Sequence, residues 1–268
     1  MYSPDTQATS RPKNLVQAIE RAAAVLNILG QFPKGLSVGE IAARIKLPKG
    51  TVHRLLSSLA FFDYVRQETT TRHYQLGFKL VELGNCLLSQ IDLRDDARPF
   101  LIALAEEVQE TVHLVVRDNQ KALYIDKVHL NPVRVGLQMV SRLGGHIPLH
   151  CSSVGKVLLA YMPEEQSDAI IRMAELTRRT RNTIVDPDKL REHLRKVHEQ
   201  GFAVDDEENE TGIRCVAAPI RNETGRVEAA ISISGPATRI TKSSIDKRLT
   251  TCVCRTALEI SRKIGYRP

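Results

Sequence analysis

The sequence predicts a protein of the mixed α+β class with two domains, a small winged helix-turn-helix followed by a larger domain of strands and helices. The chain has 268 residues, a length typical of two domains. Residues 1–75 hold ten Lys/Arg and five Asp/Glu, whereas the remaining residues hold twenty-eight and twenty-six. Helical periodicity dominates the first sixty residues, and strand-like alternation becomes frequent only after residue 110. A basic helical module therefore precedes a nearly neutral α+β domain.

The composition indicates in which cellular compartment the protein works and what kind of molecule its first domain binds. No run of about 18 apolar residues exists, and the first residues lack the apolar segment of a signal peptide. The five cysteines, an odd number in a chain of this length, indicate reduced thiols rather than a disulfide framework. We therefore expect a cytoplasmic protein that does not engage a membrane. Most of the net charge of +7 lies in the first quarter of the chain, which suggests a polyanionic partner for that domain.

Three helices are expected before residue 62. The first covers about Asn14 to Gln31, with an apolar side that repeats at helical spacing. The second opens at Ser37, where Glu40 three residues later completes a capping box. The third follows after a few residues, and two short helices joined by a tight turn form a helix-turn-helix.

The third helix presents a polar and basic face. In the stretch LPKGTVHRLLSSL the apolar residues fall at positions i, i+3, i+4 and i+7, which makes one buried stripe. The side chains left facing outward are those of Lys49, Thr51, His53, Arg54 and Ser57. A helix of this kind fits the major groove of double-stranded DNA, where such groups meet base edges and phosphates. A small helical bundle with a solvated face, serving protein contacts, is the alternative.

Two β-favouring segments around a polar tip follow the third helix. They run from Tyr64 to Gln67 and from His73 to Leu76, and they predict a hairpin, the wing of a winged helix-turn-helix. Arg66 and Arg72 would then lie near the phosphate backbone or a minor groove.

The larger domain shows alternating elements. Residues 76–93 have apolar residues at helical spacing, and a second amphipathic helix is expected from Asp95 to Glu110. The other expected helices are Ser153–Tyr161, Glu164–Ala174, Pro187–Gln200 and Lys242–Ile264, and the expected strands are Thr111–Arg117, Ala122–His129, Val133–Gln138, Phe202–Asp205, Cys215–Ile220 and Arg226–Ser234.

Two features of this domain suggest a site for a small polar ligand. The run from Ser152 to Gly155 opens a helix, and the free backbone N–H groups of a helix start favour an anion. Ser232 and Ser234 share one face of a strand whose other face carries isoleucines. Satisfied strand serines without a ligand are the alternative.

Catalysis and metal binding are disfavoured. His146, His150 and Cys151 lack the spacing of a paired metal motif, so no metal or cofactor is expected. Cys151 or Ser152 before a helix could be a nucleophile, but no G-x-S-x-G elbow accompanies them. A thiol-dependent enzyme is thus the weakest of the functions considered.

Several motifs together resemble the IclR family of bacterial transcriptional regulators. They are Gly35–Ser37 with Glu40–Ala42, Leu47–Lys49 with Thr51–Leu56, Tyr74–Gly77, Pro148–Ala160, Glu208–Pro219 and Ala230–Pro236, and the similarity runs from about residue 14 to residue 265. Gly50 stands where the family commonly has serine, which gives up a hydroxyl near the expected DNA contact.

The resemblance implies a domain organisation and a ligand. It implies a winged helix-turn-helix over 12–75, a linker helix over 76–93 that helps to pair two chains, and a GAF-like effector-binding domain over 94–268. It maps the contacts of a small acid to Asp205, Cys215, Ser232 and Ser234, with the N–H groups of Ser153 and Val154. We therefore expect a dimeric or tetrameric regulator, a repressor, that binds operator DNA and responds to a small carboxylate such as a 2-keto or sugar acid. A metabolite-binding protein whose first domain contacts proteins is the alternative.

Overall fold

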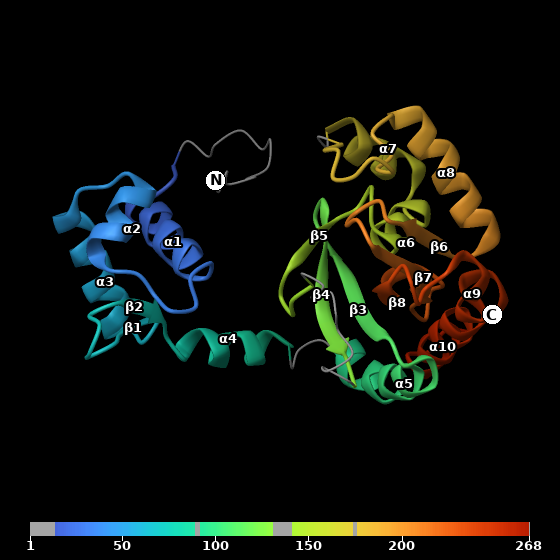
Figure 1. Cartoon of the computed structure of the whole chain (residues 1–268), viewed down its shortest axis with the longest axis horizontal. Coiled ribbons are helices and arrows are strands. Elements are labelled where there is room, and N and C mark those ends of the chain that lie inside the picture. Colours follow the sequence, from blue (N-terminus) through green and yellow to red (C-terminus); the bar gives the residue numbers. More distant parts are fainter. Residues whose placement is uncertain (1–13, 89–91, 131–140, 174–175, 268) are drawn as a thin grey trace. The chain divides into compact units, whose positions relative to one another are not determined.

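The structure, a computed structural model, describes residues 14–88, 92–130, 141–173 and 176–267. Two compact units make up the chain, Met1–Gln90 and Ile91–Pro268, each with its own core (Figure 1). Both helices and an antiparallel sheet are present, so the predicted α+β class is confirmed. Among the described residues, no helix is both long and apolar enough to cross a membrane.

Three helices form the core of the first unit. They are α1 (Gln17–Leu29), α2 (Val38–Ile45) and α3 (Lys49–Phe61). The capping box that opens α2 is confirmed: the Ser37 backbone N–H donates to Glu40 Oε2 at 2.8 Å, and Ser37 Oγ accepts from the Glu40 N–H at 3.3 Å. These contacts fix where α2 begins, and so where its apolar side meets α1 and α3. The shared core consists of Val25, Ile28, Leu29, Leu36, Ile41, Ala42, Val52, Leu56, Val65 and Tyr74.

A short hairpin follows α3, as predicted. Strands β1 (Val65–Gln67) and β2 (Tyr74–Leu76) pair antiparallel, with Val65 opposite Leu76. The next helix, α4, spans Lys79–Leu88, so the expectation of one helix over 76–93 is wrong at both ends. Leu76 is held in the hairpin by its strand partner, and Asp92 already belongs to the following helix, α5 (Asp92–Val108).

The turn from β2 into α4 depends on a glycine. A Cβ atom at Gly77 would lie 2.0 Å from the carbonyl oxygen of Asp63. Any side chain there would push the two backbone segments apart. This close approach, together with the hydrogen bond from the Gly77 N–H to the Tyr64 carbonyl oxygen at 2.8 Å, holds the end of β2 against the segment that follows α3.

A six-stranded antiparallel sheet organises the second unit. Its strand order is β5-β4-β3-β8-β7-β6. The strands are β3 (Thr111–Asp118), β4 (Lys121–Val128), β5 (His146–Pro148), β6 (Ala203–Asp206), β7 (Ile213–Arg221) and β8 (Val227–Pro236). Strand β5 was not expected from the sequence, and the strand expected over Val133–Gln138 lies outside the described residues.

Helices cover both faces of this sheet (Figure 1). Helices α5 and α10 (Thr250–Lys263) pack on the face that carries Ile231 and Ile233. The other face is covered by α6 (Ser153–Ala160), α7 (Glu164–Met173) and α8 (Pro187–Gln200). The single helix expected over Lys242–Ile264 is instead divided into α9 (Lys242–Ser244), a π-helical turn (Ile245–Leu249) and α10. Because Ile245 and Leu249 are both buried, this turn keeps the two apolar side chains in the core.

Candidate functional site

Helix α3 separates an apolar face from a polar one. Val52 and Leu56 are fully buried. On the opposite face the side chains of Lys49, His53, Arg54 and Ser57 are exposed, and that of Thr51 is half-buried. The exposed face therefore carries the groups predicted to contact DNA, and no described residue of the first unit covers it.

Two of these side chains also have contacts within the protein. The Ser57 hydroxyl donates to the carbonyl oxygen of His53 at 3.0 Å, so its oxygen remains an acceptor. The Lys49 side chain lies across the start of α2, where its Cε is 3.5 Å from the position that a Cβ on Gly39 would occupy. The small residue at position 39 thus lets the lysine stem approach α2 closely.

The wing holds its two predicted arginines differently. Arg66 donates to Gln75 Oε1 at 3.1 Å, and its guanidinium lies 5.0 Å from the centre of the Phe78 ring. Arg72 occupies the hairpin turn with a positive φ of 58° and is exposed. Arg66 is therefore oriented by its neighbours, whereas Arg72 projects from the tip of the wing.

The predicted ligand residues of the second unit form a row across the sheet. Asp205 on β6 pairs in register with Cys215 on β7, which pairs with Ser234 on β8, which pairs with Thr111 on β3. Residues opposite each other in neighbouring strands project from the same face. These polar side chains consequently lie together on the face that α6 covers.

A second, adjacent row continues this surface. Ser232 on β8 pairs with Ala217 on β7 and with His113 on β3. The hydroxyl oxygens of Ser232 and Ser234 are 3.5 Å apart, and both serines are buried. The predicted alternation along β8 is confirmed. Ser232 and Ser234 lie on one face of the strand, whereas Ile231 and Ile233 lie on the other face and pack against α5 and α10.

The first turn of α6 packs closely against the residues that immediately precede the helix. Ser152 is the N-cap, and its hydroxyl accepts from the Gly155 N–H at 3.1 Å. The N–H groups of Ser153 and Val154 precede that residue, where an α-helix offers no internal acceptor. A Cβ at Gly155 would lie 2.5 Å from the Leu149 backbone, so only glycine allows this approach.

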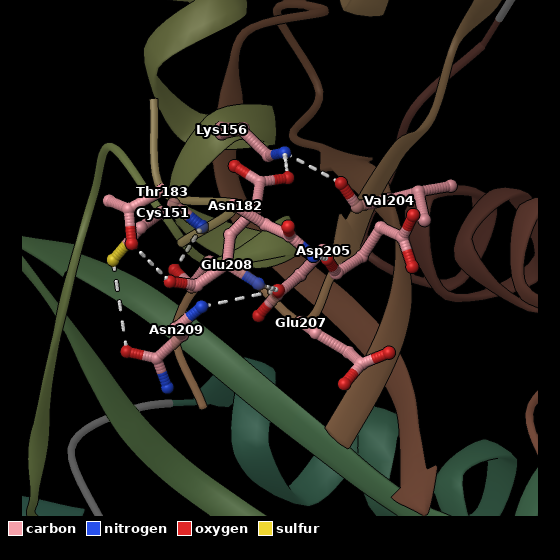
Figure 2. A network of polar contacts seen from close by, with 12 residues as sticks. Cys151, Lys156, Asn182, Thr183, Val204, Asp205, Glu207, Glu208 and Asn209 are labelled. Atoms are coloured by element: carbon pink, nitrogen blue, oxygen red, sulfur yellow. Dashed lines mark hydrogen bonds and ion pairs between the residues drawn. The ribbon is translucent and has the colours of Figure 1, made fainter. Parts of the chain in front are cut away.

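A buried polar network joins α6 to the loop after β6 (Figure 2). Lys156, which is fully buried, forms an ion pair with Glu208 and donates to the carbonyl oxygen of Val204 at 2.6 Å. The loop is further held by Asp205 Oδ1, which accepts from the Glu208 N–H at 2.7 Å, and by Thr183 Oγ1, which donates to the Glu208 carbonyl oxygen at 2.7 Å. These contacts fix the position of Asp205 relative to the start of α6.

Asp205 is poised between its two protonation states. Burial raises its pKa to about 7, with the neighbouring Glu208 adding to the rise and Lys156 opposing it. Near neutral pH the carboxyl group can therefore either donate or accept a hydrogen bond. Asp205 and Glu208 are both buried.

Two further residues face this region without a clear signal in the sequence. Tyr124 on β4 is buried, and burial raises the pKa of its phenol, with Cys215 and Asp205 adding to the rise. His113 is buried beside it, with ring centres 4.9 Å apart. Strand alternation alone could have placed His113 on the face of Thr111, but the sequence does not reveal which strand lies next to it.

The residues considered for metal binding or catalysis have other partners. His146 Nε2 lies 2.7 Å from Asp118 Oδ2, and His150 Nε2 lies 3.2 Å from the Thr177 carbonyl oxygen. Burial raises the pKa of the Cys151 thiol to about 12, which disfavours the reactive thiolate. Within the described parts of the chain, no group of three or more His, Cys, Asp or Glu could hold a metal ion.

Two surface cavities lie away from the polar rows. One, of about 410 Å³, is lined by Leu93, Asp96, Ile220, Asn222, Glu223, Glu228, Ala229 and Ile264. The other, of about 360 Å³, is lined by Arg178, Asn182, Thr183, Ile184, Val185, Asp186, Lys189, Glu192, His193 and Lys196. Neither includes a residue predicted to hold a ligand.

Comparison with known proteins identifies both units. The profile of the IclR helix-turn-helix domain matches residues 18–69, and that of the bacterial transcriptional regulator IclR C-terminal region matches residues 86–262. The chain is 32% identical over 252 residues to the HTH-type transcriptional regulator XynR of Escherichia coli K12, covering 94% of this chain and 98% of that protein. It is 34% identical over 262 residues to the HTH-type transcriptional repressor AllR of Salmonella typhi, covering 98% and 95%.

The fold agrees with this similarity. The crystal structure of the Thermotoga maritima IclR superposes with a TM-score of 0.78 at 35% identity, covering 92% of this chain and 98% of that one. These relatives are regulators of transcription, not enzymes, and they have the DNA-binding helix-turn-helix described above. The chain belongs to the IclR family of bacterial transcriptional regulators.

Proposed function

We propose that this DNA-binding regulator is a repressor whose affinity for its operator is controlled by a small organic acid bound in the second unit. The relative AllR is named a repressor, which supports the sign of regulation. The observation that carries the ligand part is the alignment of Asp205, Cys215 and Ser234 across three strands, beside the start of α6. Such a protein works where the chromosome lies, in the cytoplasm.

The proposed DNA interface is the exposed face of α3 together with the wing. Lys49, Thr51, His53, Arg54 and Ser57 would face the major groove, with Arg66 and Arg72 toward the phosphates. Supporting this assignment, all but Thr51 are exposed, and Thr51 is half-exposed. Arginine is well suited to bidentate contact with guanine, and lysine to phosphate.

Binding to a fragment of the protein's own upstream DNA tests the interface. Fluorescence anisotropy over a range of salt concentrations should show affinity that falls steeply with salt. Arg54→Ala should weaken binding by about tenfold, and by more if it reads a base. Loss of a phosphate contact by Lys49→Ala should lower the salt slope by about one. Lys189→Ala and Arg195→Ala, which remove exposed charges from the second unit, are the matched controls. Unchanged binding in both α3 variants would favour protein contacts for this domain.

The proposed effector site lies between the polar rows and α6. The carboxylate of the ligand would meet the N–H groups of Ser153 and Val154, favoured by the partial positive charge of a helix start. Ser232, Ser234 and Cys215 would offer polar contacts to the rest of the molecule. Asp205, when protonated, would donate a hydrogen bond to the acid rather than repel it.

Calorimetry with a panel of small carboxylic, keto and sugar acids tests this site. Ser234→Ala should lower affinity for the acid that binds by about fivefold to tenfold, because one buried hydrogen bond is lost. Ser58→Ala, in the first unit, is a control that leaves the site untouched. Equal heats for wild type and Ser234→Ala would remove that serine from the site.

We further propose that the regulator acts at least as a dimer. The first unit exposes several large apolar side chains at the start of α1, at the end of α3 and around the start of α4, namely Leu15, Val16, Ile19, Phe61, Phe62, Phe78, Val81 and Leu83. Exposed large apolar side chains in such number are typical of an interface with another chain. A two-fold dimer would match two half-sites in DNA, and the effector would act by favouring one arrangement of the DNA-binding units. Sedimentation at several protein concentrations measures the assembly.

A further inference from the structure

His113 has a ring nitrogen with no partner in the described protein. The residue is only 2% exposed, and its Nδ1 is buried without a hydrogen bond to any described residue. A buried polar group in this state costs free energy unless a ligand or ordered water satisfies it. His113 lies in register with Ser232, in the row next to that of Cys215 and Ser234. The unpaired nitrogen is therefore part of the face proposed to hold the effector.

The neighbours of His113 favour one of the two tautomers of its neutral ring. Lys127, which has donors only, contacts the Ser141 carbonyl oxygen at 2.8 Å and Ser141 Oγ at 2.9 Å. Ser141 Oγ thus accepts from the lysine, and we assign its own hydrogen to His113 Nε2, 2.9 Å away, because this hydrogen has no other acceptor among the described residues. An accepting Nε2 is unprotonated, so the proton of the neutral ring resides on Nδ1.

The ring stays neutral over the physiological range. Burial lowers the pKa of His113 to about 3, and the positive charge of Lys127 adds to the decrease. A neutral imidazole in this tautomer has a single N–H donor, that of Nδ1, which points in one direction. It does not attract a carboxylate as a charged histidine would.

We propose that His113 is a specificity-determining residue of the effector site, where its Nδ1–H donates to an uncharged oxygen of the ligand. The preferred ligand is then a carboxylic acid that also carries a keto or hydroxyl group, and the simple acid of the same size binds more weakly. The inference rests on the proposed function, because it requires an acid to bind on this face of the sheet. The N–H groups at the start of α6 bind the carboxylate, and the Nδ1–H of His113 donates to the keto or hydroxyl oxygen of the ligand.

The tautomer is measurable without any ligand. Long-range ¹H–¹⁵N correlation spectra of the full-length protein with labelled histidine distinguish protonated from unprotonated ring nitrogens. His113→Gln identifies the signal of His113 by its loss. We expect a protonated Nδ1 and an unprotonated Nε2 across neutral pH. A proton on Nε2, or a charged ring at pH 7, overturns the proposal.

Selectivity is tested with matched acids, pyruvate against propionate and 2-oxoglutarate against glutarate. Calorimetry on wild type should show the oxo acid bound about tenfold more tightly, because its analogue leaves a buried donor unpaired. His113→Asn, whose amide places an N–H near the position of Nδ1, should retain this preference. His113→Gln, which reaches toward Ser141 but has nothing at the position of Nδ1, should bring the ratio close to one.

The controls separate the two proposals. Ser234→Ala should weaken both members of a pair alike and leave their ratio unchanged. An unaltered ratio in His113→Gln, with binding still dependent on Ser234, overturns the role of His113 and leaves the proposed function standing. If neither these pairs nor the wider panel of carboxylic, keto and sugar acids contains an acid that binds, while the promoter fragment does bind, the organic-acid part of the proposed function fails, and the role of His113 fails with it.

Discussion

Replacing Lys156 with methionine should destabilise the second unit in a way that depends on pH. Lys156 is fully buried, and Glu208 is 5% exposed, so neither charge has water as an alternative partner. The substitution removes the ammonium group and leaves an unbranched apolar thioether side chain of similar volume. Glu208 must then remain as an unpaired buried carboxylate or bind a proton.

The cost follows from the proton that Glu208 takes up. Binding a proton at pH 7 costs about 1.4 kcal/mol for each unit by which the pH exceeds the pKa, or roughly 3 kcal/mol for a carboxyl near its ordinary value of 4.5. Burial already raises the pKa of Glu208 in the wild-type protein, so part of this cost is present before the substitution. Losing the hydrogen bond from Lys156 to the Val204 carbonyl oxygen adds about 1 kcal/mol. We therefore expect a loss of about 3–4 kcal/mol at pH 7, in the range for a broken buried ion pair.

The sign of the pH effect is fixed by linkage. Without Lys156 the folded-state pKa of Glu208 rises further above its unfolded value, so the penalty is absent at low pH and grows as the pH rises above about 4.5. Asp205 loses the same neighbouring cation and changes in the same direction. The loss at pH 5 should thus be about 2 kcal/mol smaller than the loss at pH 7.

Urea unfolding followed by far-UV circular dichroism measures this loss, since the chain has no tryptophan. Lys189→Met, at an exposed position, is the matched control and should change stability by less than about 0.5 kcal/mol. The double variant Lys156→Met with Glu208→Gln should remove most of the added pH dependence. A loss in Lys156→Met that is the same at pH 5 and pH 7 would refute the reasoning.

Three further substitutions test other parts of the structure. Because burial raises the pKa of Asp205 from 3.8 to about 7, the folded protein holds this proton more tightly, and the carboxyl costs stability as the pH rises through that interval. Asp205→Asn should accordingly gain on the order of 2 kcal/mol over wild type between pH 5 and pH 8 in urea unfolding, and identical pH profiles would contradict it. Gly50→Ala should stabilise the first unit by about 0.5–1 kcal/mol, because Gly50 lies in α3 and a Cβ added there would meet no described atom within 4 Å. Ser37→Ala should destabilise the same unit by about 1 kcal/mol by removing the capping box, and thermal unfolding should show these two changes with opposite signs.

Much of the first unit was predictable because its signals are local. The capping box at Ser37 and Glu40 and the apolar stripe containing Val52 and Leu56 each depend on residues within two helical turns. Where the expectation was wrong, a distant contact decided the outcome. Leu76 continues a helical apolar pattern, yet its partner Val65 holds it in a strand.

The candidate ligand site was only partly predictable. Alternation along β8 placed Ser232 and Ser234 on one face, and the structure confirms that placement. From the sequence, Lys156 is indistinguishable from an ordinary surface lysine, because no local pattern shows that Glu208 lies close enough to form a buried ion pair with it. The same holds for His113, whose role depends on Ser141, a residue 28 positions later.

By itself, the sequence determined where most helices and strands form, which of their faces are apolar, where the positive charge gathers and to which family the motifs point. These properties arise from backbone propensity, capping and side-chain period, all of which act over a few residues. Only the tertiary structure decided that Asp205, Cys215 and Ser234 share a row, that Lys156 meets Glu208, and that His113 has a nitrogen beside them that no described residue pairs. Strand order and register depend on packing among segments far apart in the chain, and that information is distributed over the whole core.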